Sequence, residues 1–212
     1  MISILMPIFN GIEFIEESVN SIITQSYTDW ELLIAVNGYD ENSDVYKIAK
    51  QYESKCPPNK IRVFDFYTIK GKPYTLNALI EYCNYNYIAL LDVDDIWKQD
   101  KLLTQSQYLN KYDVIGSNCV YFGDMPGVIP YIPVGDISSF DFNKVNPIIN
   151  SSSIIRKELC YWNNVFTEDY DLWLRLRKKD KLFYNCSEIL VMHRIHNNSY
   201  FNATTRNTNR SI

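Results

Sequence analysis

Three carboxylates fall within four positions at Asp92, Asp94 and Asp95, directly after the apolar run 87–91. A buried strand that ends in carboxylates is unfavourable unless a cation neutralises them. Because side chains alternate along a strand, we expect Asp92 and Asp94 to point to one side and Val93 into the core. Paired carboxylate oxygens suit Mg²⁺ or Mn²⁺. The stretch therefore predicts a metal site.

An exposed turn would explain the same carboxylates without any ligand. Carboxylates are common in turns, and we expect Asp95 to cap the helix that follows it, which is an ordinary structural role. For Asp92 and Asp94, the buried strand ahead of them makes an exposed turn the poorer explanation. We therefore interpret these two residues as functional.

A second acidic group opens the segment 167–179, where Glu168, Asp169 and Asp171 precede apolar residues at helical spacing. We expect an amphipathic helix there, capped by Thr167. Acidic side chains in a first turn are also favoured by the helix dipole. Position alone therefore does not separate a catalytic carboxylate from a structural one.

Apolar periodicity divides the chain into alternating strands and helices. Strands are expected at 2–7, 30–36, 61–66, 87–91, 114–122, 148–155 and 189–195, helices at 12–23, 45–52, 75–83, 98–111 and 167–179, and an irregular hairpin or edge at 126–133. This pattern indicates an α/β fold with a mostly parallel, Rossmann-like sheet covered by helices on both faces. We also expect Asn10 to cap the first helix and the polar stretch after Ser199 to be a flexible tail.

Two of the expected strands end in polar turns that can face one crevice. Asn37-Gly38 ends the strand at 30–36 in the way that the carboxylates end the strand at 87–91. Ligands of parallel sheets sit at the carboxyl ends of the strands, so neighbouring strand ends would line one site. Asn-Gly is first of all a turn signal, however, and needs no ligand to explain it.

Length and composition describe one soluble domain. The chain has 212 residues, of which 46% are hydrophobic and 22% charged, which is enough for a sizeable core without disulfides. Its net charge of −4 gives no reason to expect nucleic acid as a partner. Five widely spaced cysteines, without a Cys-x-x-Cys pair, favour a reducing compartment over a disulfide framework or a zinc site.

Neither a signal peptide nor a membrane span is expected. The apolar start at 1–9 is short and lacks a basic leader. No apolar run reaches the roughly 18 residues that indicate a membrane helix. We therefore expect a soluble protein of the cytoplasm, peripheral to a membrane at most.

Four segments, taken in order, resemble the inverting family 2 glycosyltransferases, which have the GT-A fold. They are similar to the family's opening strand and loop, its Asp-x-Asp metal motif, its Glu-Asp helix start and its Arg-x-His. The segments are Ser3–Asn10, Ala89–Trp97, Thr167–Leu176 and Arg194–His196.

The similarity extends over nearly the whole chain and implies a single GT-A domain at 1–199. Within it, the resemblance implies a nucleotide-sugar-binding half at 1–112 and an acceptor-binding half at 113–199. Residues 200–212 remain as the flexible tail.

A donor and a cofactor follow from the resemblance. It implies a nucleotide diphosphate sugar, with a UDP-sugar favoured, and Mn²⁺ or Mg²⁺. Asp94 would bind the ion, and Asp92 would contact the ribose or the ion's water shell. His196 would be a third metal ligand or a diphosphate contact, although a lone histidine is usually structural. Arg194 would be a phosphate partner or form a structural ion pair.

The opening loop would hold the nucleobase. The resemblance implies that the backbone from Pro7 to Phe9 passes beside the base and that Asn37 bonds its edge. Lys70 and Lys72 flank Gly71 in a loop that relatives place near the donor, where Lys72 would contact a phosphate, although an ordinary exposed loop is the favoured explanation of both lysines. Relatives usually carry Asp-Asp-Gly-Ser where this chain has Val36-Asn37-Gly38-Tyr39. Because an amide both donates and accepts where a carboxylate only accepts, this departure bears on nucleotide choice.

An inverting transfer needs a base for the acceptor hydroxyl, and the resemblance assigns that role to Asp169. The acceptor would be a glycan, a protein or a lipid-linked hydroxyl. Relatives often have Gly-Gly-Phe ahead of the Glu-Asp pair, whereas this chain has Tyr161 and Trp162 there. We expect these rings to reshape the acceptor pocket or to stack on a sugar, unless they belong to the core.

Two other functions stay open. A degenerate module could bind a sugar nucleotide or a glycan without turnover, as the replaced turn at Asn37 would allow. A sugar-nucleotide nucleotidyltransferase also uses an α/β sheet and Mg²⁺, but it would need a Gly-rich basic loop after the first strand. Only Gly11 is present there, without a basic residue.

Overall fold

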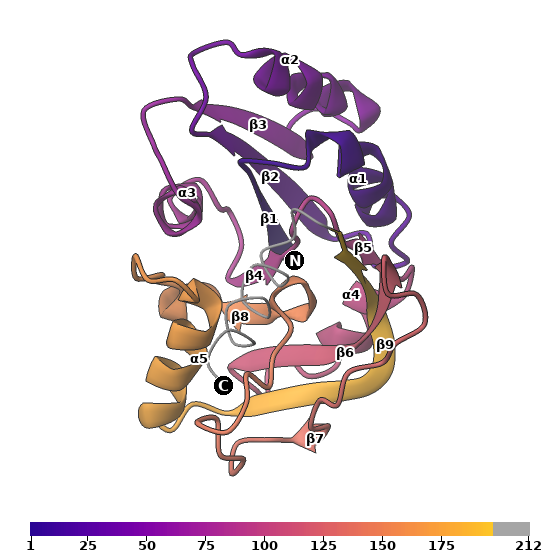
Figure 1. Ribbon diagram of the computed structural model, residues 1–212, viewed down its shortest axis with the longest axis vertical. Coiled ribbons are helices and arrows are strands. Elements are labelled where there is room, and N and C mark those ends of the chain that lie inside the picture. Colours follow the sequence, from indigo (N-terminus) through magenta and orange to yellow (C-terminus); the bar gives the residue numbers. More distant parts are fainter. Residues whose placement is uncertain (197–212) are drawn as a thin grey trace, which may run out of the picture.

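The buried apolar runs form one curled sheet (Figure 1). The computed structural model describes residues 1–196, and the tail expected at 200–212 lies outside the described residues. Within 1–196 the strands are β1 Ile2–Ile8, β2 Trp30–Asn37, β3 Ile61–Phe66, β4 Tyr87–Leu90, β5 Ile96–Trp97, β6 Val114–Gly123, β7 Gly135–Asp136, β8 Ile154–Arg156 and β9 Phe183–Ile195.

The sheet order is β3-β2-β1-β4-β8-β6-β9-β5, with β7 paired to β9. Strands β1 to β4 are parallel, and the carboxyl ends of β1, β2 and β4 therefore lie along one edge. Strand β8 reverses direction, and the long pair β6 and β9 is again parallel. This arrangement confirms the predicted mostly parallel sheet and brings the end of β9 to the end of β6.

Helices cover both faces of the sheet (Figure 1). They are α1 Ile15–Ile23, α2 Asp44–Lys50, α3 Lys72–Ile80, α4 Lys101–Ser106 and α5 Glu168–Lys178. Apolar side chains of α1, α2 and α4 join one buried cluster, and those of α3 and α5 join another on the opposite face. No helix within residues 1–196 is long and apolar enough to cross a membrane.

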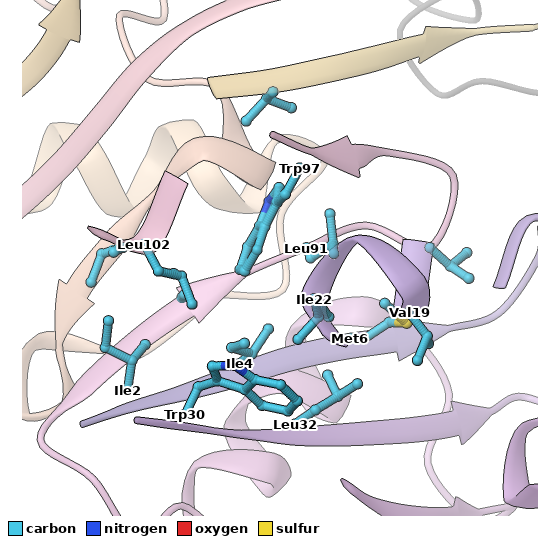
Figure 2. Close-up of a cluster of buried hydrophobic side chains, with 14 of the residues drawn as sticks. Ile2, Ile4, Met6, Val19, Ile22, Trp30, Leu32, Leu91, Trp97 and Leu102 are labelled. Carbon is cyan, nitrogen blue, oxygen red and sulfur yellow. The ribbon is translucent and has the colours of Figure 1, made fainter. Parts of the chain in front are cut away.

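Alternation along β1 shows why both faces are apolar. Ile4 and Met6 belong to the first cluster, whereas Leu5 belongs to the second. Figure 2 shows the first cluster, in which Trp30 and Trp97 pack over these strands. Continuous apolar strands are typical of a sheet buried on both sides. The α/β prediction is confirmed.

The second half departs most from the predicted elements. The strand expected at 148–155 is reduced to β8, preceded by a single 3-10 turn at Asn150–Ser152. Hydroxyls of Ser152 and Ser153 bond to backbone carbonyls there, and such local bonds compete with strand pairing. Strand β9 begins six residues before the predicted start at 189, because Asn185 and other polar residues interrupt its apolar pattern.

Helix starts also differ from the predictions. Helix α3 begins at Lys72 rather than Thr75, with Pro73 in its first turn. Gly11, not Asn10, occupies the cap position of the first 3-10 turn. Thr167 precedes α5 as expected, but its side chain makes no capping hydrogen bond.

Candidate active site

The carboxylate of Asp92 lies just beyond the end of β4 and is held from two sides. Its Oδ1 is 2.6 Å from Lys72 Nζ, and its Oδ2 accepts a hydrogen bond of 2.9 Å from Asn150 Nδ2. The Asp92 backbone N donates to Ser151 Oγ. Burial alone would raise the pKa of Asp92, but the Lys72 charge and the hydrogen bonds outweigh it and lower that pKa.

Asp94 points from the same turn toward the end of β9. Its Oδ2 is 3.0 Å from His196 Nε2, and each of the two side chains is 24% exposed. Burial and the neighbouring carboxylates of Asp95 and Asp92 raise the pKa of Asp94 to about 6. This crowding of negative charge would be relieved by a cation.

Asp95 is not a helix cap, which corrects the prediction. Its side chain is fully buried, with Oδ1 accepting from the backbone N of Arg194 and Oδ2 lying 3.0 Å from His193 Nδ1. Burial would lower the pKa of His193, but the Asp95 carboxylate raises it to about 9. A charged pair therefore joins the acidic turn to β9, while α4 starts only at Lys101.

Arg194 lies between two aromatic rings and supports the same turn. Its guanidinium carbon is 4.3 Å from the ring centres of Phe14 and Phe122. Its Nε donates to the Asp94 carbonyl oxygen at 2.8 Å, and an Nη2 donates to Glu17. With only 13% of its side chain exposed, Arg194 is placed to fix the Asp94 backbone.

Lys72 of α3 connects the first turn of α5 to the acidic turn. Glu168 Oε1 is 3.3 Å from Lys72 Nζ, so one ammonium contacts carboxylates of both segments. Asp169 Oδ2 accepts a hydrogen bond of 3.3 Å from Asn146 Nδ2. Burial raises the pKa of Asp169, and Lys72 opposes that rise.

Asn37 lies inside the opening loops rather than on their surface. It is 1% exposed; its Nδ2 donates to the Ile8 carbonyl at 3.0 Å, and its Oδ1 accepts from Gly71 N. Its amide therefore ties the loop after β1 to the loop before α3. Hydrogen bonding to a base edge would have to use the remaining amide hydrogen or oxygen lone pair.

Phe9 is the exposed part of the opening loop. Its ring lies over Gly38, where a Cβ would approach the ring to 2.6 Å. Gly38 also has φ +78°, which favours glycine. The Tyr39 hydroxyl donates to the Phe9 carbonyl, and half-buried Pro7 continues β1 beside Ala35. The expected base-binding loop is thus a hydrogen-bonded turn that presents one exposed aromatic ring.

Trp162 belongs to the core, whereas Tyr161 is exposed. Trp162 is 1% exposed, and the Asn77 side chain bonds both its backbone N and its carbonyl. The Trp162 ring is therefore not a platform for a sugar. Tyr161, 61% exposed, and Phe166, 62% exposed, lie at the surface ahead of α5.

Sequence reasoning missed the polar segment that joins the two acidic groups. Asn146 contacts Asp169 and Asn150 contacts Asp92, so residues four apart serve both carboxylates. The available signal was the run of polar residues at 150–153, which does not suit the buried strand predicted there. The structure thus brings Lys72, Asp92 and Asp169 into one neighbourhood, with Asp94 turned toward β9.

A curled α/β sheet of this topology, with acidic side chains beyond its fourth strand, is the GT-A architecture of glycosyltransferases. S. aureus TarS 1–349 in complex with UDP-GlcNAc superposes with a TM-score of 0.73 at 15% identity, covering 94% of this chain and 60% of that one. The mannosyltransferase PcManGT from Pyrobaculum calidifontis, in complex with GDP-Man and Mn²⁺, gives 0.74 at 13% identity, covering 97% and 60%. The predicted GT-A fold is confirmed.

Residues 3–183 match the family described as Glycosyl transferase family 2. The O-antigen biosynthesis glycosyltransferase WbnJ of Escherichia coli is 29% identical over 94% of this chain and 81% of its own length. The Escherichia coli UDP-Glc:alpha-D-GlcNAc-diphosphoundecaprenol beta-1,3-glucosyltransferase WfgD is 25% identical over 94% and 79%. The chain belongs to glycosyltransferase family 2 and is a glycosyltransferase.

Proposed function

We propose that the protein transfers a sugar from a nucleotide diphosphate sugar, with a UDP-sugar favoured, to a hydroxyl acceptor with inversion and with a divalent ion. One observation carries this proposal. Beyond the carboxyl end of β4, the Lys72 ammonium bridges Asp92, two residues before the Asp94 of the Asp94–His196 pair, and Glu168, the neighbour of Asp169. The Asp94–His196 pair is suited to a cation, and the Asp169 carboxylate is suited to accepting a proton.

The side chains around Asp94 fit a divalent ion that arrives with the donor. Within residues 1–196, no three His, Cys, Asp or Glu side chains gather into a ready-made metal cage. Asp94 and His196 supply one oxygen and one nitrogen ligand, which suits Mn²⁺ or Mg²⁺ completed by phosphate oxygens and water. Such an ion would neutralise charge on the departing diphosphate.

Asp169 is proposed as the base. As the acceptor oxygen bonds the anomeric carbon and the bond to the diphosphate breaks, the hydroxyl proton passes to the Asp169 carboxylate. Burial raises the pKa of Asp169 and thus strengthens it as a proton acceptor, while Asn146 holds its Oδ2. Location at the start of α5 keeps the carboxylate on a rigid element.

A UDP-sugar is favoured because UDP or a UDP-sugar appears in the names of similar proteins and structures. TarS has been solved with UDP and with UDP-GlcNAc, and WfgD is named for UDP-Glc. PcManGT, by contrast, was solved with GDP-Man. The proposed acceptor is a glycan, a protein or a lipid-linked hydroxyl, the last being the kind named for WfgD.

Calorimetry with UDP, in the presence and absence of Mn²⁺, tests the donor half. Mn²⁺-dependent UDP binding should be lost in Asp94→Ala and retained in Asp169→Asn. The matched control is Asp44→Ala, because Asp44 is an exposed carboxylate on α2. UDP binding that needs no ion, or that survives Asp94→Ala unchanged, would contradict the metal-dependent proposal.

Hydrolysis of a panel of nucleotide sugars in Mn²⁺ tests turnover and sugar choice. We expect one UDP-sugar to be hydrolysed slowly, and Asp169→Asn to slow transfer to acceptors while leaving UDP affinity intact. Tight UDP binding without turnover of any sugar in the panel would instead indicate a binding module.

A further inference from the structure

Lys72 joins three segments that are far apart in the sequence. It is the first residue of α3, and its ammonium lies 2.6 Å from Asp92 Oδ1 and 3.3 Å from Glu168 Oε1. Figure 1 shows α3 and α5 on the left of the view, one above the other. Asp92 belongs to the expected donor side, and Glu168 is adjacent to the proposed base. The ammonium therefore links the acidic turn at Asp92 to the first turn of α5.

Without Lys72, the charged groups that act on Asp169 would be carboxylates. Among the groups within residues 1–196 that act on Asp169, Glu168 and Asp92 are anions and Lys72 is the cation. A buried carboxylate beside two others favours its neutral form, whereas a nearby ammonium favours its charged form. A base must be charged to accept a proton. Lys72 thus opposes the two neighbouring carboxylates.

The contacts of Lys72 also differ from those expected of a lysine whose ammonium is reserved for a phosphate. Both partners of its ammonium are carboxylates, and the Lys72 side chain is one-third exposed. Asn146 and Asn150 support the same arrangement, since one segment donates hydrogen bonds to Asp169 and to Asp92. The acidic turn at Asp92 and the first turn of α5 are therefore held relative to each other by two independent connections.

We propose that Lys72 is a positioning residue that ties donor-side Asp92 to acceptor-side Glu168 and keeps the adjacent Asp169 in its charged form. This inference rests on the proposed transfer reaction, and it replaces the expected phosphate contact of Lys72. Loss of the ammonium should impair the base at low pH, and higher pH should restore it. Affinity for the donor should change little.

The experiment compares wild type, Lys72→Met and Lys72→Arg, after thermal melts have shown that each variant is folded. Titration of the Asp169 carboxyl carbon is followed by ¹³C NMR in the metal-free protein, with Asp169→Asn to assign the resonance. We expect Asp169 to titrate at higher pH in Lys72→Met and close to wild type in Lys72→Arg. Lys47→Met, a change at an exposed lysine, should leave the titration unchanged.

Transfer kinetics provide a second test of the role of Lys72. At pH 6.5 we expect transfer by Lys72→Met to fall on the order of tenfold, since an opposite charge near a carboxylate strongly favours ionisation, and to recover at pH 8.5. UDP affinity in Mn²⁺ should stay within about twofold of wild type. An unchanged Asp169 titration in Lys72→Met would overturn the inference. A large loss of UDP affinity with that titration unchanged would assign Lys72 to the phosphates.

Failure of the proposed transfer function can be distinguished from failure of the inference about Lys72. If wild type turns over no nucleotide sugar, the transfer proposal fails. The NMR titration then still decides whether Lys72 holds Asp169 in its charged form, because it needs neither ion nor donor.

Discussion

Lys101 is a buried amine whose removal should stabilise the protein in a pH-dependent way. The side chain is fully buried on α4, with Nζ donating to Gln105 Oε1 at 2.7 Å and lying 4.0 Å from the centre of the Trp97 ring. Burial lowers the pKa of Lys101 from 10.5 to about 7, against the opposing effect of nearby Cys186. The unfolded chain therefore binds this proton at pH values where the folded protein resists it.

The sign and size of the effect follow from linkage. Between pH 7 and 10.5 the unfolded state holds more protons at Lys101, so its contribution to stability rises with pH in that window. Relative to a Lys101→Met variant, wild type should lose about 3.5 kcal/mol of unfolding free energy between pH 10 and pH 7. This is less than about 1.36 kcal/mol for every pH unit, because the full slope applies only well between the folded and unfolded pKa values. Lys101→Met also loses the hydrogen bond to Gln105, which lowers the variant's unfolding free energy by about 1 kcal/mol at every pH.

Urea denaturation of both proteins at pH 7, 8, 9 and 10 measures this difference. We expect Lys101→Met to be the more stable at pH 7 and the two curves to converge toward pH 10. Lys98→Met, at an exposed lysine three residues earlier, should run parallel to wild type. Parallel curves for Lys101→Met would refute the reasoning, because they would show that folding leaves the protonation of this amine unchanged.

Two further changes probe the rigid parts of the site. Arg194→Lys removes the planar guanidinium between the two rings and its hydrogen bond to the Asp94 carbonyl. Calorimetry should therefore show Mn²⁺-dependent UDP binding weakened roughly tenfold in this variant. Binding should be weaker still in Arg194→Ala. Binding unchanged in both variants would show that Arg194 does not support Asp94. Gly38→Ala should cost about 1–3 kcal/mol in denaturation, because its φ is +78° and the new Cβ meets the Phe9 ring. A stability equal to wild type would mean that the ring moves freely.

The first half of the fold was predictable because its strands are long, apolar and separated by clear turn residues. Strands β1 to β4 lie within one or two residues of their predicted limits, and α1 keeps its apolar spacing. The beginning of β9 was not predictable, since Asn185 looks like a loop residue. In the structure it is fully buried and donates to the carbonyls of Pro133 and Pro147, contacts that no local pattern reveals.

The candidate site likewise combines features that local sequence predicts with contacts between distant segments that it does not. Local sequence identified the carboxylates at Asp92 and Asp94, but the surroundings that decide their roles come from segments distant in the chain. Asp95 was predicted to cap a nearby helix, and instead it pairs with His193 on the last strand. Lys72 was expected at a phosphate, and its two carboxylate partners lie on different elements. Long-range pairing of charges is invisible to spacing rules.

The bonds from Asp95 to His193 and Arg194 connect residues 98 and 99 positions apart. Closing such long loops is entropically costly and tends to come late in folding. During synthesis the acidic turn would therefore leave the ribosome well before the strand that fixes it. The chain would acquire its ordered acidic turn only after β9 is complete, which makes the activity a late product of folding and delays turnover until the whole sheet exists.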